Sequence, residues 1–224
     1  MQPKSLDHVA LWVADRDPIA DFACAHLGMH VIERTDRFTL VGSDARRGKL
    51  TLFEADGPRA PGALRGIGLR VSNLEQAVAA LPDGAGPEVD AGEGLRIRLV
   101  EGETDVDYDL DHVALVASDP ERSARDWLPL GFSPAQPRDG VPRVEVAGAF
   151  LELHEGDSAE VERPLLNHLG LLVDSADDWR TRADEAGVEI ADVVDAPNTY
   201  AVFVWGPARV KLEYVEHKSS FSLR

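Results

Sequence analysis

Histidine and glutamate recur at corresponding places of this 224-residue sequence. His8 and His112 lie in identical runs, Leu-Asp-His-Val-Ala-Leu, and His168 lies in the related run Leu-Asn-His-Leu-Gly-Leu. Glu152 and Glu213 each stand between large apolar residues in a β-rich run. Burying a carboxylate costs free energy unless a cation or hydrogen-bond donors compensate it. Imidazole and carboxylate are also the donors that suit divalent transition metals, so His112, His168 and the two glutamates are candidates for a metal site.

The histidine-containing runs open a unit that is repeated along the chain. A weaker fourth copy, at 65–73, has Gly66 where the other three have histidine. Each run is apolar and strand-like, and it ends at Asp, Asn or Ser, which favour helix N-termini. A helix is expected after each run, and short β-rich runs follow each helix. The expected helices are Pro18 to Leu27, Leu74 to Leu81, Pro120 to Leu130 and Asp177 to Ala186.

The repeat predicts an α+β fold of four βαβββ modules in tandem. We expect them to form two domains with cupped mixed sheets and helices on the outside, residues 1–105 and 106–224. The acidic, turn-rich stretch 101–107 is the expected linker between the two pairs of modules.

The opening Asp-His-Val-Ala-Leu motif and the closing Leu-Glu-Tyr strand resemble those of the vicinal oxygen chelate (VOC) superfamily. That superfamily includes glyoxalase I, methylmalonyl-CoA epimerase, extradiol dioxygenases and bleomycin-resistance proteins. The resemblance covers about residues 5–217. It implies that two modules curl around one divalent metal, Fe, Mn, Ni, Co or Zn, held by residues of the first and last strands of each module.

Carried over residue by residue, the resemblance assigns four metal ligands to the second pair of modules: His112, Glu152, His168 and Glu213. Glu152 and Glu213 are also the expected catalytic carboxylates. His154 shares the strand face of Glu152, and it is either an acid/base group beside the metal or a residue of the rim.

The first pair of modules does not match the ligand pattern. His8 is present, but Thr51, Gly66 and Arg98 stand at the other three ligand positions. A single ligand cannot hold a metal, and Arg98 would repel one. This half is therefore expected to be structural or to line a dimer interface.

The number of metal ligands separates two enzyme classes. Four protein ligands on a six-coordinate ion leave two positions, enough for the enediolate of a glyoxalase- or epimerase-type lyase or isomerase. Extradiol ring cleavage needs three open positions and therefore two histidines and one carboxylate. With Glu152 as a ligand, the lyase or isomerase is favoured, and the dioxygenase is the alternative. A binding or antibiotic-resistance protein is a third possibility.

Composition limits the partners. The chain has 23 Lys and Arg against 40 Asp and Glu, a net charge of −17, which disfavours nucleic acid and anionic lipid surfaces. Cys24 is the only cysteine, so no intrachain disulfide can form. No apolar run reaches the roughly 18–20 residues of a membrane span. We expect a cytoplasmic protein, a monomer or homodimer, that acts on a small molecule.

Overall fold

The structure is a computed structural model that describes residues 2–158 and 161–223. It contains the four predicted modules, and in the described residues the second module has one strand fewer than predicted. The first module consists of β1 (Ser5–Val13), α1 (Arg16–His26), β2 (His30–Arg34), β3 (Phe38–Asp44) and β4 (Arg47–Glu54). The second consists of β5 (Leu64–Val71), α2 (Leu74–Ala79), β6 (Glu88–Asp90) and β7 (Arg96–Glu101).

The third and fourth modules each add a short 3₁₀ helix. The third consists of β8 (Asp109–Ala117), α3 (Pro120–Trp127), η1 (Leu128–Leu130), β9 (Ser133–Arg138), β10 (Val141–Val146) and β11 (Ala149–Glu155). The fourth consists of β12 (Leu166–Leu172), α4 (Ala176–Glu185), β13 (Ile190–Asp195), β14 (Thr199–Trp205), η2 (Pro207–Arg209) and β15 (Lys211–His217).

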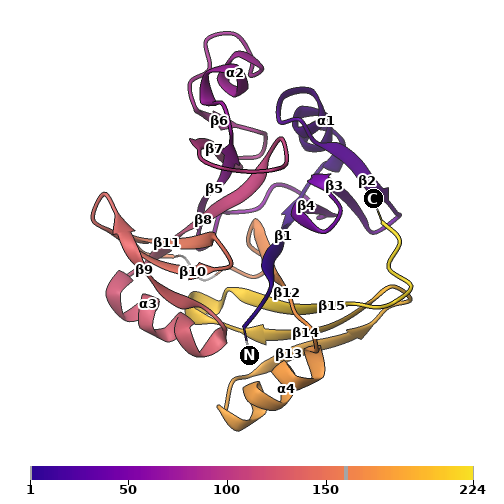
Figure 1. Ribbon diagram of the computed structural model, residues 1–224, viewed down its shortest axis with the longest axis vertical. Helices are drawn as coiled ribbons and strands as arrows, with labels where there is room; N and C mark the ends of the chain where they lie inside the picture. Colours follow the sequence, from indigo (N-terminus) through magenta and orange to yellow (C-terminus); the bar gives the residue numbers. More distant parts are fainter. Residues whose placement is uncertain (1, 159–160, 224) are drawn as a thin grey trace.

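Each helix begins where the sequence places an N-cap. The side chains of Asp15, Asn73, Asp119 and Ser175 each accept a hydrogen bond from a backbone N–H in the first turn of the following helix. Such caps satisfy donors that have no partner within the helix. The four helices lie on the outside of the molecule, as expected (Figure 1).

The modules combine into two mixed sheets, and the combination differs from the expected one. The outer-module sheet joins the fourth and first modules in the strand order β13-β14-β15-β12-β1-β4-β3-β2. The inner-module sheet joins the second and third modules in the order β6-β7-β5-β8-β11-β10-β9. Each sheet therefore contains one module from each side of residue 105, and the sheets do not follow the predicted division. The α+β class with cupped mixed sheets is confirmed.

Two glycines explain why the sequence does not determine which modules pair with each other in a sheet. A Cβ at Gly170 would lie 2.2 Å from the His8 ring, and one at Gly68 would lie 2.1 Å from the His112 ring. The second and fourth modules thus leave room for a histidine from a partner module. Either the first or the third module could supply it, because both carry the same six-residue run.

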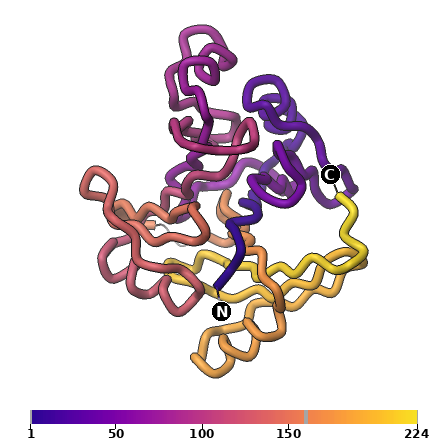
Figure 2. The backbone as a smooth tube through the Cα atoms, viewed as in Figure 1, coloured from indigo at the N-terminus to yellow at the C-terminus, as the bar shows by residue number. Residues whose placement is uncertain are grey.

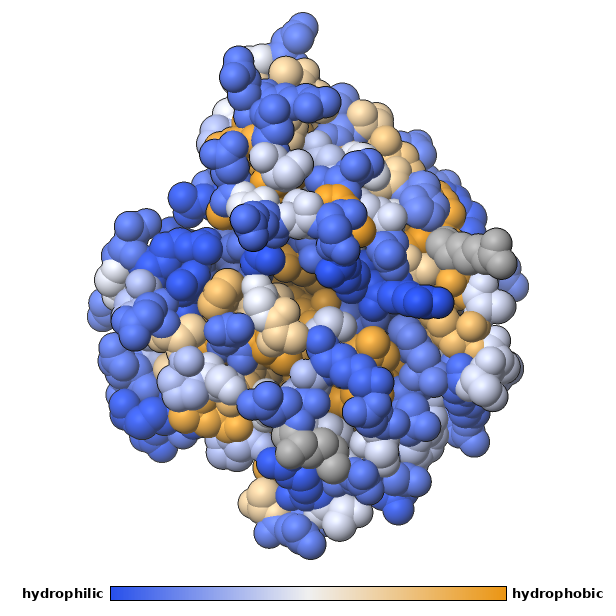
Figure 3. Space-filling view, in the orientation of Figure 1, coloured by the Kyte–Doolittle hydropathy of each residue, from blue (hydrophilic) through white to orange (hydrophobic). Residues whose placement is uncertain are grey.

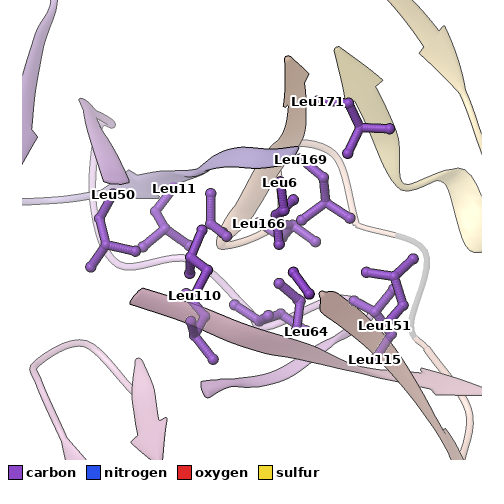
Figure 4. Close-up of a cluster of buried hydrophobic side chains, with 14 of the residues drawn as sticks. Leu6, Leu11, Leu50, Leu64, Leu110, Leu115, Leu151, Leu166, Leu169 and Leu171 are labelled. Atoms are coloured by element: carbon purple, nitrogen blue, oxygen red, sulfur yellow. The ribbon is translucent and has the colours of Figure 1, made fainter. Parts of the chain in front are cut away.

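The two sheets share one hydrophobic core. Leucines of the outer-module sheet meet leucines of the inner-module sheet in a continuous cluster, which includes Leu6, Leu11, Leu50, Leu64, Leu110, Leu115, Leu151, Leu166, Leu169 and Leu171 (Figure 4). Burial of apolar surface supplies most of the stability of such a fold. The two sheets are therefore held together as one packed unit.

The C-terminal segment returns to the first module. The C-terminal segment lies beside the first module (Figure 2), where the Lys49 ammonium is 5.8 Å from the centre of the Phe221 ring. The face shown in Figure 3 is largely hydrophilic, with apolar residues gathered in the hollow at its centre.

Candidate metal centre

Three buried side chains of the outer-module sheet converge on one point. His8 lies on β1, His168 on β12 and Glu213 on β15, all three at most 9% exposed. The Nε2 atoms of the two histidines are 3.0 Å apart. Glu213 Oε2 lies 2.9 Å from Nε2 of His8 and 3.0 Å from Nε2 of His168. Among the described residues, these are the three that cluster as possible metal ligands. We call them the triad.

A β-bulge immediately before each histidine fixes its ring. The strand register shifts at Asp7 and at Asn167, so each is an extra residue in its strand. Asp7 Oδ2 lies 2.9 Å from His8 Nδ1, and Asn167 Oδ1 lies 3.1 Å from His168 Nδ1. Both partners are acceptors, so each Nδ1 carries a proton and donates. A neutral imidazole held in this way directs the lone pair of Nε2 into the triad.

The Nε2 lone pairs of the two histidines and the Oε2 atom of Glu213 face one another, and three electron-rich atoms this close together are stabilised by a cation between them. Glu213 Oε2 is buried with no hydrogen-bond donor assigned to it. Ligand atoms about 2.1 Å from a metal and at right angles lie about 3.0 Å apart, whereas tetrahedral ligands lie about 3.4 Å apart. The spacings of the triad, 2.9 to 3.0 Å, match one face of an octahedron. The residues present therefore fit a divalent metal ion.

The electrostatics of the triad also favour a cation. Burial lowers the pKa of His8, but the carboxylates of Glu213 and Asp7 outweigh burial and raise that pKa to about 9. Burial raises the pKa of Glu213, but His8 and His168 outweigh it and lower that pKa well below its usual range. Without a metal, a proton on His8 is thus held in the position where positive charge is needed.

A buried ion pair supports the ring of His8 from behind. Lys49 and Asp7 are only 3% and 2% exposed, and Lys49 Nζ lies 2.9 Å from both carboxylate oxygens of Asp7. Lys49 also donates to the carbonyl oxygen of Ala45 over 2.6 Å. Burial raises the pKa of Asp7, but His8 and Lys49 outweigh it and lower that pKa. The carboxylate therefore stays charged and holds the proton of Nδ1 in place.

Thr51 occupies the fourth ligand position of this sheet. In the fourth module, Gly170 pairs with Glu213, and in the first module, Ala10 pairs with Thr51 at the same register. The alignment of modules made from sequence is thus confirmed at this position. A threonine hydroxyl is a much weaker ligand than a carboxylate, so the site offers two histidines and one carboxylate.

In the inner-module sheet, arginine stands where a metal would be expected. His112 Nε2 lies 3.5 Å from Glu152 Oε2, farther than in the triad. Arg138 Nη1 is 3.3 Å from Glu152 Oε1, so a guanidinium already compensates this carboxylate. The second module contributes Gly66 and Arg98 at the two remaining ligand positions. This pair is therefore part of a salt-bridge network.

The expectation of one four-ligand site in residues 106–224 is corrected accordingly. The structure places His168 and Glu213 with His8, and it places His112 and Glu152 in the other sheet. His154 lies beside Glu152, with Nε2 3.7 Å from Oε2, and is therefore away from the triad. The error arose because neighbouring modules were assumed to pair with each other.

Sequence reasoning missed His8 as a ligand, and it missed the residues that hold the rings. His8 was set aside because the first two modules contain only one ligand-type residue between them. The roles of Asp7 and Asn167 were also missed, although a signal was present: an Asp or Asn precedes all three histidines. The support by Lys49 has no comparable signal, because it depends on the strand register of β1 and β4.

A matched pair of glycine substitutions tests this geometry. Gly170→Ala pushes a methyl group into the His8 ring, and we expect it to weaken binding of Mn²⁺ at least about 10-fold. Gly68→Ala makes the same clash with His112, so it should destabilise the fold by about 1–3 kcal/mol without weakening Mn²⁺ binding. Titration calorimetry and urea unfolding of both variants measure the two effects. Equal losses of Mn²⁺ affinity would contradict the placement of the metal.

Comparison with known proteins agrees with the fold described above. Residues 5–84 match the model of the Glyoxalase/Bleomycin resistance protein/Dioxygenase superfamily. No curated protein matches the chain significantly. Within the described residues, no helix combines the length and hydrophobicity needed to cross a membrane.

Solved structures of similar fold cover nearly the whole chain. A "putative dioxygenase" from Bacillus subtilis matches with a TM-score of 0.78 at 16% identity, over 96% of this chain and 86% of that one. Glyoxalase I from Zea mays matches with a TM-score of 0.74 at 15% identity, over 95% and 92%. The cppA protein from Streptococcus pneumoniae matches with a TM-score of 0.64 at 15% identity, over 93% and 96%. The resemblance to the VOC superfamily is thereby confirmed in two respects: residues 5–84 match the model of the Glyoxalase/Bleomycin resistance protein/Dioxygenase superfamily, and nearly the whole chain shares the fold of these solved structures.

Proposed function

We propose that this protein is a metal-dependent enzyme whose triad binds one divalent transition metal, and that it cleaves a small aromatic vicinal diol with dioxygen. The observation that carries the proposal is the ligand set: two histidines and one carboxylate at octahedral spacing, with Thr51 in the fourth position. This set is typical of non-haem Fe²⁺ oxygenases, because it leaves three positions for substrate and dioxygen.

The residues around the triad set the orientation of its imidazoles and the net charge of the site. A divalent metal held by His8, His168 and Glu213 would supply Lewis acidity toward a diol and one-electron chemistry toward dioxygen. Glu213 would be the only anionic ligand, so the loaded site would keep one net positive charge and would attract a diol as its monoanion. Asp7 and Asn167 hold the two imidazoles in the tautomer that a metal requires. Both atoms of dioxygen enter the product as one ring carbon–carbon bond breaks, so the reaction needs no external reductant.

Two aromatic side chains lie beside the triad. The ring centres of Phe203 and Phe53 lie 5.1 and 6.2 Å from that of His168. These rings exclude water and offer a surface on which an aromatic substrate can stack. The fold of the Bacillus subtilis protein, whose name mentions a dioxygenase, is compatible with this reaction.

A glyoxalase- or epimerase-type lyase or isomerase is the alternative class. The preference for it from sequence depended on Glu152 as a fourth ligand, and Glu152 lies in the other sheet. The fold of glyoxalase I from Zea mays is compatible with this class, but the three-ligand site favours the oxygen-dependent reaction.

Metal content and oxygen uptake test the proposal. We expect one Fe²⁺ or Mn²⁺ per chain, and oxygen consumption when the anaerobically loaded protein meets a panel of substituted catechols. The panel is run in parallel with hemithioacetals of methylglyoxal, the substrate type of a lyase. Turnover of the hemithioacetals without oxygen uptake would establish the alternative class, and absence of metal binding would refute both.

Replacing Thr51 by Glu tests whether the number of ligands decides the chemistry. The new carboxylate would stand at the position equivalent to Glu213, so we expect Mn²⁺ to bind at least about 10-fold more tightly. Oxygen uptake should fall by a similar factor, because one open position is lost. Thr51→Val serves as the control and should change both quantities little. Faster oxygen uptake in the Glu variant would contradict the ligand count.

A further inference from the structure

A cleft of about 760 Å³ opens beside the triad in the outer-module sheet. Its volume lies within the range of small-molecule sites, roughly 300–1,000 Å³. Trp12 and Trp205 line it, together with the cationic side chains of Arg163, Arg209 and Lys211. None of these five residues belongs to the ligand set described above.

The cleft is continuous with the surroundings of the triad. Lys211 lies two residues before Glu213 on β15, on the same strand face and about 7 Å along the strand. Trp12 packs on Phe53 with ring centres 5.4 Å apart, and Phe53 in turn packs on His168. A molecule that reaches the triad with one end can therefore place its other end in this cleft.

The aromatic walls of the cleft carry cations. The Arg163 guanidinium lies 5.7 Å from the centre of the Trp12 ring. The Arg209 guanidinium lies 4.1 Å and the Lys211 ammonium 5.1 Å from the centre of the Trp205 ring. A flat ligand can stack against these rings while its charged group meets the cations.

The charge of the cleft is opposite to that of the protein. The whole chain carries a net charge of −17, yet the described lining has three cations and one carboxylate, that of Glu162. Arg209 pairs with Glu189, which is exposed, over 2.9 Å. Within the described part of the chain, Lys211 and Arg163 form no ion pair. Lys211 is also only partly exposed, so its ammonium group faces the cleft with limited access to water.

We propose that this cleft binds the carboxylate arm of the substrate, and that the substrate is therefore an anionic aromatic compound. The inference deepens the proposed function and rests on it for the orientation: the diol end reaches the triad, and the carboxylate lies between Lys211 and Arg163. The two tryptophans hold the part of the substrate that joins these ends.

Binding of phenylacetate to the metal-free protein tests the cleft without any turnover. Phenylacetamide has nearly the same shape without the charge, and we expect it to bind at least about 10-fold more weakly by titration calorimetry. Lys211→Met and Arg163→Gln should each weaken phenylacetate binding about 10-fold and leave phenylacetamide binding unchanged. Arg122→Gln, an exposed position on α3, is the matched loss of one positive charge and should change neither.

Two outcomes would overturn the inference. One is equal affinity for phenylacetate and phenylacetamide, and the other is unchanged phenylacetate binding in both cleft variants. A missing oxygen uptake with intact phenylacetate selectivity would refute the dioxygenase reaction and leave the anion site standing. In the active enzyme, Lys211→Met should raise KM about 10-fold for a catechol with a carboxylate arm, and it should leave KM for unsubstituted catechol unchanged.

Discussion

Glu213→Gln is expected to lower the affinity for Mn²⁺ by about 100-fold or more, and to abolish turnover. The amide has the shape of the carboxylate but removes the only anionic ligand, and its NH₂ group cannot donate a lone pair to a metal. Glu213 Oε2 contacts both histidines at 2.9 to 3.0 Å, so no other described carboxylate can take its place. Titration calorimetry or the electron paramagnetic resonance signal of free Mn²⁺ measures the loss.

Glu152→Gln is the matched control, because Glu152 stands at the same module position in the other sheet. We expect it to leave Mn²⁺ affinity within about 2-fold of the wild type, because Arg138 already compensates that carboxylate. Circular dichroism shows whether both variants are folded. The placement of the metal would be refuted if Glu152→Gln lost the metal and Glu213→Gln kept it.

Asp111→Asn is expected to destabilise the protein by about 3 kcal/mol at pH 7. Asp111 is 2% exposed and lies 3.0 Å from both Arg70 and Arg138 and 2.8 Å from His112 Nδ1. Removing one partner of a buried charge network leaves the others uncompensated, which costs about 3–5 kcal/mol where burial is complete. The two arginines are partly exposed, so the lower end of this range applies.

The pH dependence of this effect has a definite sign. Burial raises the pKa of Asp111, but His112 and Arg138 outweigh it and lower that pKa far below the ordinary value. A carboxyl group with a lowered folded-state pKa contributes stability above its unfolded pKa, about 3.9, and loses it as the pH falls further. Urea unfolding of wild type and variant should therefore differ by about 3 kcal/mol at pH 7 and by less at pH 3.

Asp105→Asn provides the comparison for a solvated ion pair. Asp105 contacts Arg47 but its side chain is 83% exposed, so its loss should cost much less than the loss of Asp111. If the two variants were equally stable, or if the deficit of Asp111→Asn persisted unchanged at pH 3, the buried network would not be the source of the effect.

Much of the fold could be predicted because each module is encoded locally. The six-residue opening runs and the helix N-caps lie within a few residues of the structure they specify. The equivalence of Thr51 and Glu213 also followed, since it depends only on how the last strand of each module aligns with the first strand of the same module.

The partner of each module could not be predicted, and the error in the site follows from that. Gly170 accommodates His8, but the third module carries the same run and would fit the same space. The choice depends on contacts between whole sheets, and these are spread over many leucines of similar type. His168 and Glu213 were therefore identified as site residues, whereas His112 took the place that belongs to His8.

The pairing of the first module with the last also sets when the site can form. Glu213 lies on the final strand and His8 on the initial one, so the ligands are separated by almost the entire length of the polypeptide. During synthesis, β15 must have left the ribosome before the three donors can meet. A fragment ending before β15 lacks the carboxylate, and one beginning after β1 lacks an imidazole. If the triad binds a metal as proposed, tight metal binding would require both β1 and β15, and it would report that these two strands have come together in one sheet.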